Sequence, residues 1–232
     1  MTPLEPAAGI ELLDDPAAEP AAVRQSLINI ARANRWFGGW EAVRHGLARV
    51  LSGIPRDART TLSLLDIGTG AGDLPRLAVH WAARRGVRLQ AIGLERHPAA
   101  ARLAQQGGLT TFVGDGAALP MADKSVDLLL LSQVLHHFAP ESIVRLLREC
   151  SRVARLGVIV ADLRQSPLAA FGWRFTGPLL RFDRHTVADG ITSLKRGFTV
   201  QSLRGLLDAA GVPALVTTHR GVRIVAAWRH AP

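Results

Sequence analysis

The sequence predicts a single doubly wound α/β domain, in which helices cover a mostly parallel sheet. Short apolar runs of strand length alternate with segments of helical periodicity from about residue 62 onward. Parallel neighbouring strands need such crossover helices. A chain of 232 residues is long enough for one large domain. Its 48% hydrophobic and 20% charged residues are typical of a soluble globular protein.

The first part of the chain precedes this alternation. Residues 1–20 combine proline and alanine with acidic residues and no base, which predicts a mobile acidic tail. Apolar positions then recur at helical spacing from Ala21 to Leu51, with a break at Gly38-Gly39. We therefore expect residues 21–58 to form an N-terminal helical cap on a main domain of residues 59–232.

The main domain contains five predicted strands before a long insertion. These strands are Leu62–Ile67, Val87–Leu94, Leu109–Val113, Val126–Ser132 and Val158–Ala161. The predicted helices between them are 73–85, Pro98–Gln106 and one that begins at Pro140. Residues 163–198 place aromatic side chains among arginines, and a stretch of that length is expected to act as a lid. A helix over Thr199–Ala210 and a hairpin of Ala214–Thr218 with Val222–Trp228 complete the prediction.

A glycine-rich turn after the first strand is the strongest functional signal. In Asp66–Asp73, glycines at alternate positions allow positive φ angles, so a ligand can lie against the backbone. A dinucleotide-binding turn needs its third glycine where this chain has Asp73, a carboxylate that would repel a pyrophosphate. A ligand that carries an ammonium and a sulfonium group is not repelled. The spacing therefore favours S-adenosylmethionine over NAD.

Acidic residues follow the next two strands, at the edge of the sheet where ligands gather in open α/β folds. Glu95 ends the second strand, and we expect it to accept hydrogen bonds from ribose hydroxyls. Asp115 follows the third strand, where it is placed to accept from an adenine amino group. The complete predicted cofactor-binding set is Asp66, Gly68, Thr69, Gly70, Gly72, Glu95, Arg96, Asp115, Gly116 and Gln133.

Residues 60–163 resemble a class I S-adenosylmethionine-dependent methyltransferase of the small-molecule group that includes quinone-biosynthesis methyltransferases. The glycine turn, Glu95, Ser125–Leu129 and Leu135–Phe138 support the resemblance. It implies a Rossmann-like sheet of seven strands, the last one antiparallel, and the cofactor roles given above. Ala154–Gly157 departs from the family, whose members usually have a Pro-Gly-Gly turn there.

The N-terminal cap and the insertion resemble methyltransferases found beside bacterial type III polyketide synthases. The Arg32–Gly39 stretch and the aromatic residues of the insertion support this second resemblance. It implies O-methylation of a hydrophobic phenolic or polyketide-type molecule, as in secondary metabolism. Methylation at carbon of a quinone precursor uses the same cofactor residues and stays open as an alternative.

Two histidines follow the fourth strand, at the same edge of the sheet. Histidine titrates near neutral pH, so His136 or His137 is a candidate base for a hydroxyl acceptor, with Asp162 after the fifth strand to orient it. Some natural-product sugar O-methyltransferases have a similar arrangement. If both histidines open a helix, they point about 100° apart and only one faces the acceptor. His185 is a further catalytic candidate on the insertion, although a solvated loop also explains it.

Composition also bears on disulfides, cellular location, membrane spans and metal sites. The only cysteine, Cys150, excludes an internal disulfide and, with no export signal, favours a cytoplasmic location. No apolar run approaches the roughly 20 residues of a membrane span. No carboxylate cluster at ligand spacing is visible, so we expect no metal.

The net charge of +9 raises the alternative of a nucleic-acid methyltransferase. The arginines are nevertheless scattered, and no Asn/Asp-Pro-Pro-aromatic motif follows the fourth strand, where Ser132–Leu135 stand instead. A non-catalytic protein that retains the cofactor site is the remaining alternative. We expect a hydrophobic small-molecule acceptor, no nucleic acid, no membrane insertion, and a monomer or homodimer.

Overall fold

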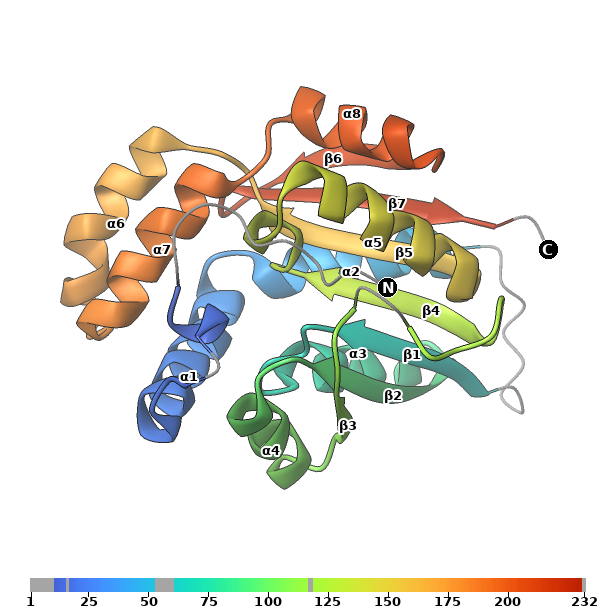
Figure 1. Cartoon of the computed structure of the whole chain (residues 1–232), viewed down its shortest axis with the longest axis horizontal. Helices are drawn as coiled ribbons and strands as arrows, with labels where there is room; N and C mark the ends of the chain where they lie inside the picture. Colours follow the sequence, from blue (N-terminus) through green and yellow to red (C-terminus); the bar gives the residue numbers. More distant parts are fainter. Residues whose placement is uncertain (1–10, 16, 53–60, 117–118, 231–232) are drawn as a thin grey trace.

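A seven-stranded sheet forms the centre of the computed structural model, which describes residues 11–15, 17–52, 61–116 and 119–230 (Figure 1). The strand order is β3-β2-β1-β4-β5-β7-β6. The strands are β1 (Thr61–Ile67), β2 (Arg88–Glu95), β3 (Thr110–Val113), β4 (Val126–Ser132), β5 (Ala154–Leu163), β6 (Leu215–His219) and β7 (Arg223–Arg229). β1 to β5 pair in parallel, and β7 is antiparallel to both of its neighbours. The predicted doubly wound fold is confirmed.

Helices cover both faces of this sheet. α2 (Gly39–Leu51) and α3 (Asp73–Ala83) share one buried cluster with Leu128 and Leu130 of β4. α5 (Pro140–Val153) and α8 (Val200–Ala210) share another with Leu129 and Leu131. Because successive residues of a strand point to opposite faces, β4 needs apolar side chains at every position between the layers. This explains its uninterrupted apolar sequence.

The fifth strand begins earlier than predicted. β5 starts at Ala154, directly after α5 ends at Val153, so no turn separates them. The Arg155 guanidinium donates a hydrogen bond to Asp127 of β4 at 2.7 Å. A Cβ atom at Gly157 would lie 2.5 Å from the Trp228 carbonyl oxygen, so glycine is required within the strand. The departure from the family turn therefore lengthens β5.

The insertion after β5 consists of two paired helices, which the sequence analysis did not resolve. α6 (Pro167–Leu179) and α7 (Arg184–Arg196) lie side by side at one end of the molecule, next to α1 (Pro20–Trp36) (Figure 1). Ser166 accepts a hydrogen bond from the Ala169 amide at the start of α6, and Asp183 caps α7 in the same way. On its other side α1 packs against α4 (Pro98–Gln106).

The end of the predicted mobile tail is packed against the protein. A short 3-10 helix, Leu12–Asp14, follows Glu11, whose side chain is buried. The mobile-tail prediction is therefore wrong for residues 11–15, because their acidic groups have buried partners. Residues 1–10, residues 53–58 of the predicted cap and the first two residues of the predicted main domain, 59–60, lie outside the described part of the chain. Among the helices described, none is both long and apolar enough to cross a membrane.

Candidate functional site

A cavity of about 490 Å³ lies at the carboxyl ends of the central strands. Its walls come from the loops after β1, β2, β3 and β4, from α1, α6 and α7, and from the N-terminal turn. All predicted cofactor residues except Gly72 line it, as do His136 and His137. Asp162 stands behind one of these histidines. The structure thus brings together residues that the sequence places at five separate strand ends and loops.

The glycine turn has the backbone conformation that its sequence predicts. Gly68, Gly70 and Gly72 have φ angles of 69°, 55° and 71°, a region that strongly favours glycine. At Gly68, moreover, a Cβ atom would lie 2.5 Å from the Val134 side chain. The turn is tied to β2, because the Gly70 amide donates to Glu95 Oε2 at 2.8 Å. The loop therefore presents bare backbone to the cavity.

Asp66 places a buried carboxyl group beneath this turn. Its Oδ2 accepts a hydrogen bond from the Thr69 hydroxyl at 2.7 Å. Within the described residues its Oδ1 has no hydrogen-bond partner. Burial raises the pKa of Asp66 to about 8, and the nearby Asp73 and Glu95 add to this effect. A positively charged ligand group would satisfy the unpaired oxygen and favour the ionised carboxylate.

A chain of polar side chains crosses the cavity wall from α3 to β7. Asn34 of α1 donates to Asp73 at 3.1 Å and accepts from the Gln133 amide at 2.7 Å. Gln133 in turn accepts from the guanidinium of Arg223 at 2.8 Å. Arg223 is buried, and burial lowers its pKa to about 10. This chain fixes α1 over the glycine turn.

Two members of this chain are not predicted as site residues from the sequence. Asn34 belongs to the Arg32–Gly39 stretch of the cap, and Arg223 stands within the apolar run Val222–Trp228. Arg223 lies in an otherwise apolar strand of the predicted hairpin. A charged residue is rarely buried without a partner, so an arginine at the start of this apolar run is the one sequence signal for a polar partner.

His136 forms a buried pair with Asp162. Its Nδ1 lies 2.6 Å from Asp162 Oδ1, and both side chains are almost completely buried. Burial opposes ionisation of Asp162, but the charge and hydrogen bond of His136 and the Leu163 amide outweigh it, so the pKa of Asp162 is lowered. An ionised Asp162 accepts a hydrogen bond from Nδ1–H of His136. In a neutral imidazole the proton is then on Nδ1, so Nε2 carries none and can act as a base.

His137 lies beside His136 but has different partners. The ring centroids are 4.3 Å apart and the planes differ by 34°, and both residues line the cavity. A short 3-10 turn, Leu135–His137, replaces the helix start on which the expectation of a single histidine facing the acceptor depends, so the histidine that faces the acceptor stays a prediction. His137 Nδ1 lies 3.0 Å from Asp14 Oδ1. Burial acts to lower the pKa of His137, but Asp14 and Glu11 outweigh burial and raise it.

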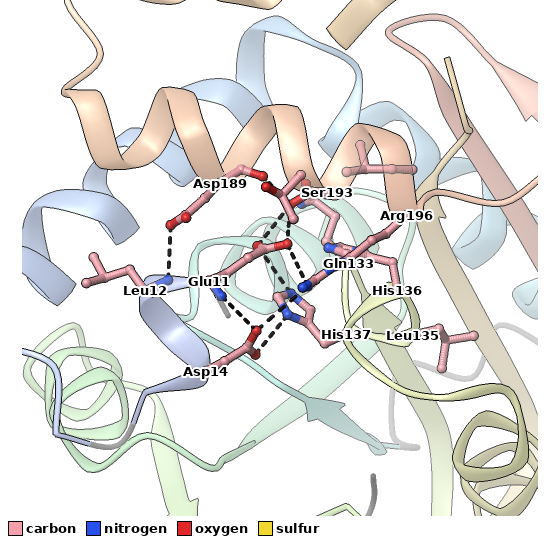
Figure 2. Close-up of polar contacts among 12 residues, drawn as sticks. Glu11, Leu12, Asp14, Gln133, Leu135, His136, His137, Asp189, Ser193 and Arg196 are labelled. Atoms are coloured by element: carbon pink, nitrogen blue, oxygen red, sulfur yellow. Dashed lines mark hydrogen bonds and ion pairs between the residues drawn. The ribbon is translucent and has the colours of Figure 1, made fainter. Parts of the chain in front are cut away.

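The N-terminal turn lines the same cavity, and polar contacts hold it against α7 (Figure 2). Glu11 accepts hydrogen bonds from the Ser193 hydroxyl at 2.9 Å and from Arg196 at 3.1 Å, both on α7. The Leu12 amide donates to Asp189 at 3.2 Å. Burial raises the pKa of Asp189 to about 6, and Glu11 and Asp14 contribute to the rise. Composition alone gave no signal for these contacts, since they join residues far apart in the sequence.

His185 does not belong to this site. Its side chain is exposed at the start of α7 and does not line the cavity, so it is not retained as a catalytic candidate. The correction follows from helix geometry, since α7 turns Thr186, Asp189 and Ser193 toward the cavity instead.

Glu11, His136 and His137 place one ligand-type atom each within 4.8 Å of one another. The sequence does not predict such a cluster. The Glu11 carboxylate, however, already accepts from Ser193 and Arg196, and a guanidinium beside it disfavours a second cation. The absence of a metal cofactor stays a prediction.

Aromatic side chains line the part of the cavity next to α6. Phe37 and Trp173 line it and meet edge to face, with ring centroids 5.5 Å apart. Other aromatic residues of the cap and insertion point elsewhere, since Trp36, Phe171 and Phe175 are more than half exposed. Of the aromatic residues in the Arg32–Gly39 stretch and in the insertion, Phe37 and Trp173 line the cavity.

Comparisons with known proteins agree with this geometry. A methyltransferase-domain family model matches residues 65–161. A probable S-adenosylmethionine-dependent methyltransferase of Mycolicibacterium smegmatis is 29% identical over 221 residues, which cover 93% of this chain and 79% of that protein.

Two solved structures share the fold. One is an S-adenosylmethionine-dependent methyltransferase from Aquifex aeolicus, with a TM-score of 0.62, 13% identity, and coverage of 92% of this chain and 99% of that one. The other is the magnesium protoporphyrin IX methyltransferase of Synechocystis PCC 6803 with bound S-adenosylmethionine. Its TM-score is 0.60 at 14% identity, over 97% of this chain and 100% of that one.

Proposed function

We propose that the chain is a class I S-adenosylmethionine-dependent methyltransferase that methylates an oxygen atom of a hydrophobic phenolic or polyketide-type small molecule. The observation that carries this proposal is the buried His136–Asp162 pair at the wall of the cavity. A hydroxyl acceptor must lose a proton, and this pair supplies a base.

The residues around the glycine turn fit the cofactor. The unpaired Oδ1 of Asp66 suits the cofactor's ammonium group, and the bare backbone of Gly68 and Gly70 allows close approach. Glu95 holds the ribose hydroxyls, and Asp115 with Gly116 holds the adenine. Thr69, Arg96 and Gln133 complete the same wall. When bound, the cofactor supplies a methyl group on a sulfonium, which is electrophilic enough to need no metal.

His136 removes the proton of the acceptor. Asp162 accepts from Nδ1 and keeps the ring in the tautomer whose Nε2 is free. The acceptor O–H bond breaks as the bond to Nε2 forms, and the imidazolium charge is balanced by the buried carboxylate. Without Asp162 the ring would lose both its orientation and this charge balance.

His137 acts beside this base as a positive group. Asp14 and Glu11 raise its pKa, so it remains protonated to higher pH than an ordinary histidine. A positive charge near an acceptor hydroxyl lowers the pKa of that hydroxyl and stabilises the phenolate. The N-terminal turn thereby takes part in the chemistry through its contact with His137.

The apolar wall favours a hydrophobic acceptor. Phe37 and Trp173 offer aromatic surface, and a small number of polar groups lie at one end of the cavity. Residues Ala169–Thr176 of α6 cover this side, consistent with the predicted lid.

Product analysis tests the proposal. The protein is incubated with S-adenosylmethionine and a panel of alkylated phenols, hydroxylated aromatics and quinone precursors, and products are analysed by mass spectrometry and NMR. We expect O-methyl ethers that depend on His136. A methyl group attached to ring carbon would contradict O-methylation and favour the quinone-precursor alternative.

A further inference from the structure

α6 separates the cavity from the surroundings, and its two long faces are both largely apolar. The face toward the cavity contributes Ala169, Gly172, Trp173 and Thr176 to the lining. A helix that only covers a pocket would be expected to expose polar residues on its other face. α6 does not follow this pattern.

The outer face of α6 is a continuous apolar stripe. Its members are 81%, 62%, 61% and 81% exposed, in the order Leu168, Phe171, Phe175 and Leu179. The spacing of three and four residues places them along one side of the helix. The rings of Phe171 and Phe175 form an edge-to-face pair, with centroids 5.2 Å apart. Large apolar side chains gathered in this way mark an interaction surface.

The charge around the stripe has one sign. Residues 164–182 contain Arg164, Arg174 and Arg181, all exposed, and no acidic residue. The next acid, Asp183, is turned inward, where it accepts hydrogen bonds from Asn29 and from the α7 amides. The stripe is thus bordered by unopposed positive charge, in a chain whose net charge is +9.

These features together point to a lipid surface. A helix with exposed Phe and Leu on one side and arginines beside them is typical of segments that lie in a membrane interface. The apolar side chains enter the headgroup region, and the arginines meet lipid phosphates. α6 is placed for this contact, because it lies at the outer end of the molecule, away from the sheet (Figure 1).

We propose that the α6 stripe docks this protein on an anionic phospholipid bilayer, with Leu168, Phe171, Phe175 and Leu179 in the interface and Arg174 and Arg181 on headgroup phosphates. The contact needs no membrane-spanning helix. It places the lid of the cavity against the bilayer, the phase in which a hydrophobic acceptor concentrates. The docking itself does not depend on which acceptor is methylated.

Vesicle flotation with the full-length protein tests the proposal. Vesicles of phosphatidylcholine alone are compared with vesicles of equal parts phosphatidylcholine and phosphatidylglycerol. We expect binding to the anionic vesicles that Phe171→Ser/Phe175→Ser weakens by about tenfold or more, since each buried aromatic contributes apolar surface. Arg174→Gln/Arg181→Gln should weaken it by about fivefold per arginine, because each is worth about 1 kcal/mol near such a surface.

Phe112→Ser is the matched control. Phe112 is an aromatic residue of similar exposure, 56%, and it lies on the edge strand β3, outside α6. It should bind like the wild type. All stripe residues are exposed, so thermal unfolding of the variants should match the wild type. Wild-type protein that stays unbound, or variants that bind equally, would overturn the proposal. A wild-type dimer in sedimentation velocity that the Phe171/Phe175 variant converts to a monomer, without vesicle binding, would assign the stripe to a second copy instead.

Discussion

Asp14 and His137 are 123 residues apart in the sequence, yet Asp14 Oδ1 lies 3.0 Å from His137 Nδ1. The pair joins the N-terminal turn to the loop after β4 and sets two neighbouring histidines in different electrostatic surroundings. His136 faces one buried carboxylate through Nδ1, whereas His137 faces Asp14 with Glu11 nearby. The two rings, tilted by 34° to each other at the same wall, are therefore suited to different roles.

Asp14→Asn should lower the pKa of His137 and weaken the fold within a limited pH window. The raised pKa of His137 stabilises the folded state below the ordinary histidine value of about 6.5, and this contribution is lost as pH rises through the folded value. At low pH the limit is set by Asp14, whose pKa is lowered in the folded state. The stabilisation from its ionised carboxylate is lost as pH falls through that lowered pKa. Between these limits we expect a loss of about 1–2 kcal/mol.

NMR titration of His137 and denaturant unfolding at several pH values measure both effects. Asp15→Asn, which removes a neighbouring charge, is the control. An unchanged His137 titration in Asp14→Asn would show that the N-terminal turn does not set its charge.

His136→Gln should lower kcat by about two to four orders of magnitude while cofactor affinity stays near the wild-type value. The reason is that His136 removes the acceptor proton and does not hold the cofactor. Asp162→Asn should also lower kcat, because the amide cannot balance the imidazolium charge. His185→Ala serves as the control, since this exposed histidine lies outside the cavity. A His136→Gln enzyme that keeps its full rate across the pH range would place proton removal elsewhere.

Glu95→Gln should weaken S-adenosylmethionine binding by about tenfold to a hundredfold, the effect of losing a hydrogen bond to a charged group. It should also loosen the glycine turn, because Glu95 Oε2 accepts from the Gly70 amide. Isothermal titration measures the affinity, and Glu41→Gln, at an exposed ion pair on α2, is the control. Equal affinity in the two variants would remove Glu95 from the ribose site.

Cofactor binding should release a proton from Asp66 at pH about 6.5, where an α-amino group is already protonated. The raised pKa of Asp66, about 8, keeps its carboxyl protonated in the free protein. A bound cation lowers that pKa, so the proton leaves. Titrations in buffers of different ionisation enthalpy count the protons. Binding heat independent of buffer in the wild type would contradict the placement of the ammonium at Asp66.

The pKa of Asp66 also has a consequence for the free protein. Its folded-state pKa lies above the ordinary value of 3.8, so the folded state holds a proton that the unfolded chain has lost. The contribution of this group to stability therefore falls as pH rises from about 4 to about 8. Asp66→Asn should remove that part of the pH dependence.

The sheet and the glycine turn were predictable because their signals are local. The apolar run of β4 and the alternating glycines after β1 fix backbone conformation within a few residues. The same argument placed Glu95, Asp115 and His136 at one edge of the sheet, where the structure has them.

The N-terminal turn was not predictable, since its stability comes from contacts such as Glu11 with Ser193, 182 residues away. A composition of proline, alanine and acids predicts disorder only while those acids lack partners. Arg223 escaped notice for the same reason, because its partners Gln133 and Phe37 lie in other parts of the chain. Long-range polar pairs leave no period in a sequence.

A crystal structure with S-adenosylhomocysteine, the demethylated product of the cofactor, tests the central claim most directly. The account predicts the amino group at Asp66, the ribose at Glu95, and the sulfur facing the space that His136 lines. A nucleoside bound away from the glycine turn, or a sulfur directed away from His136, would contradict it.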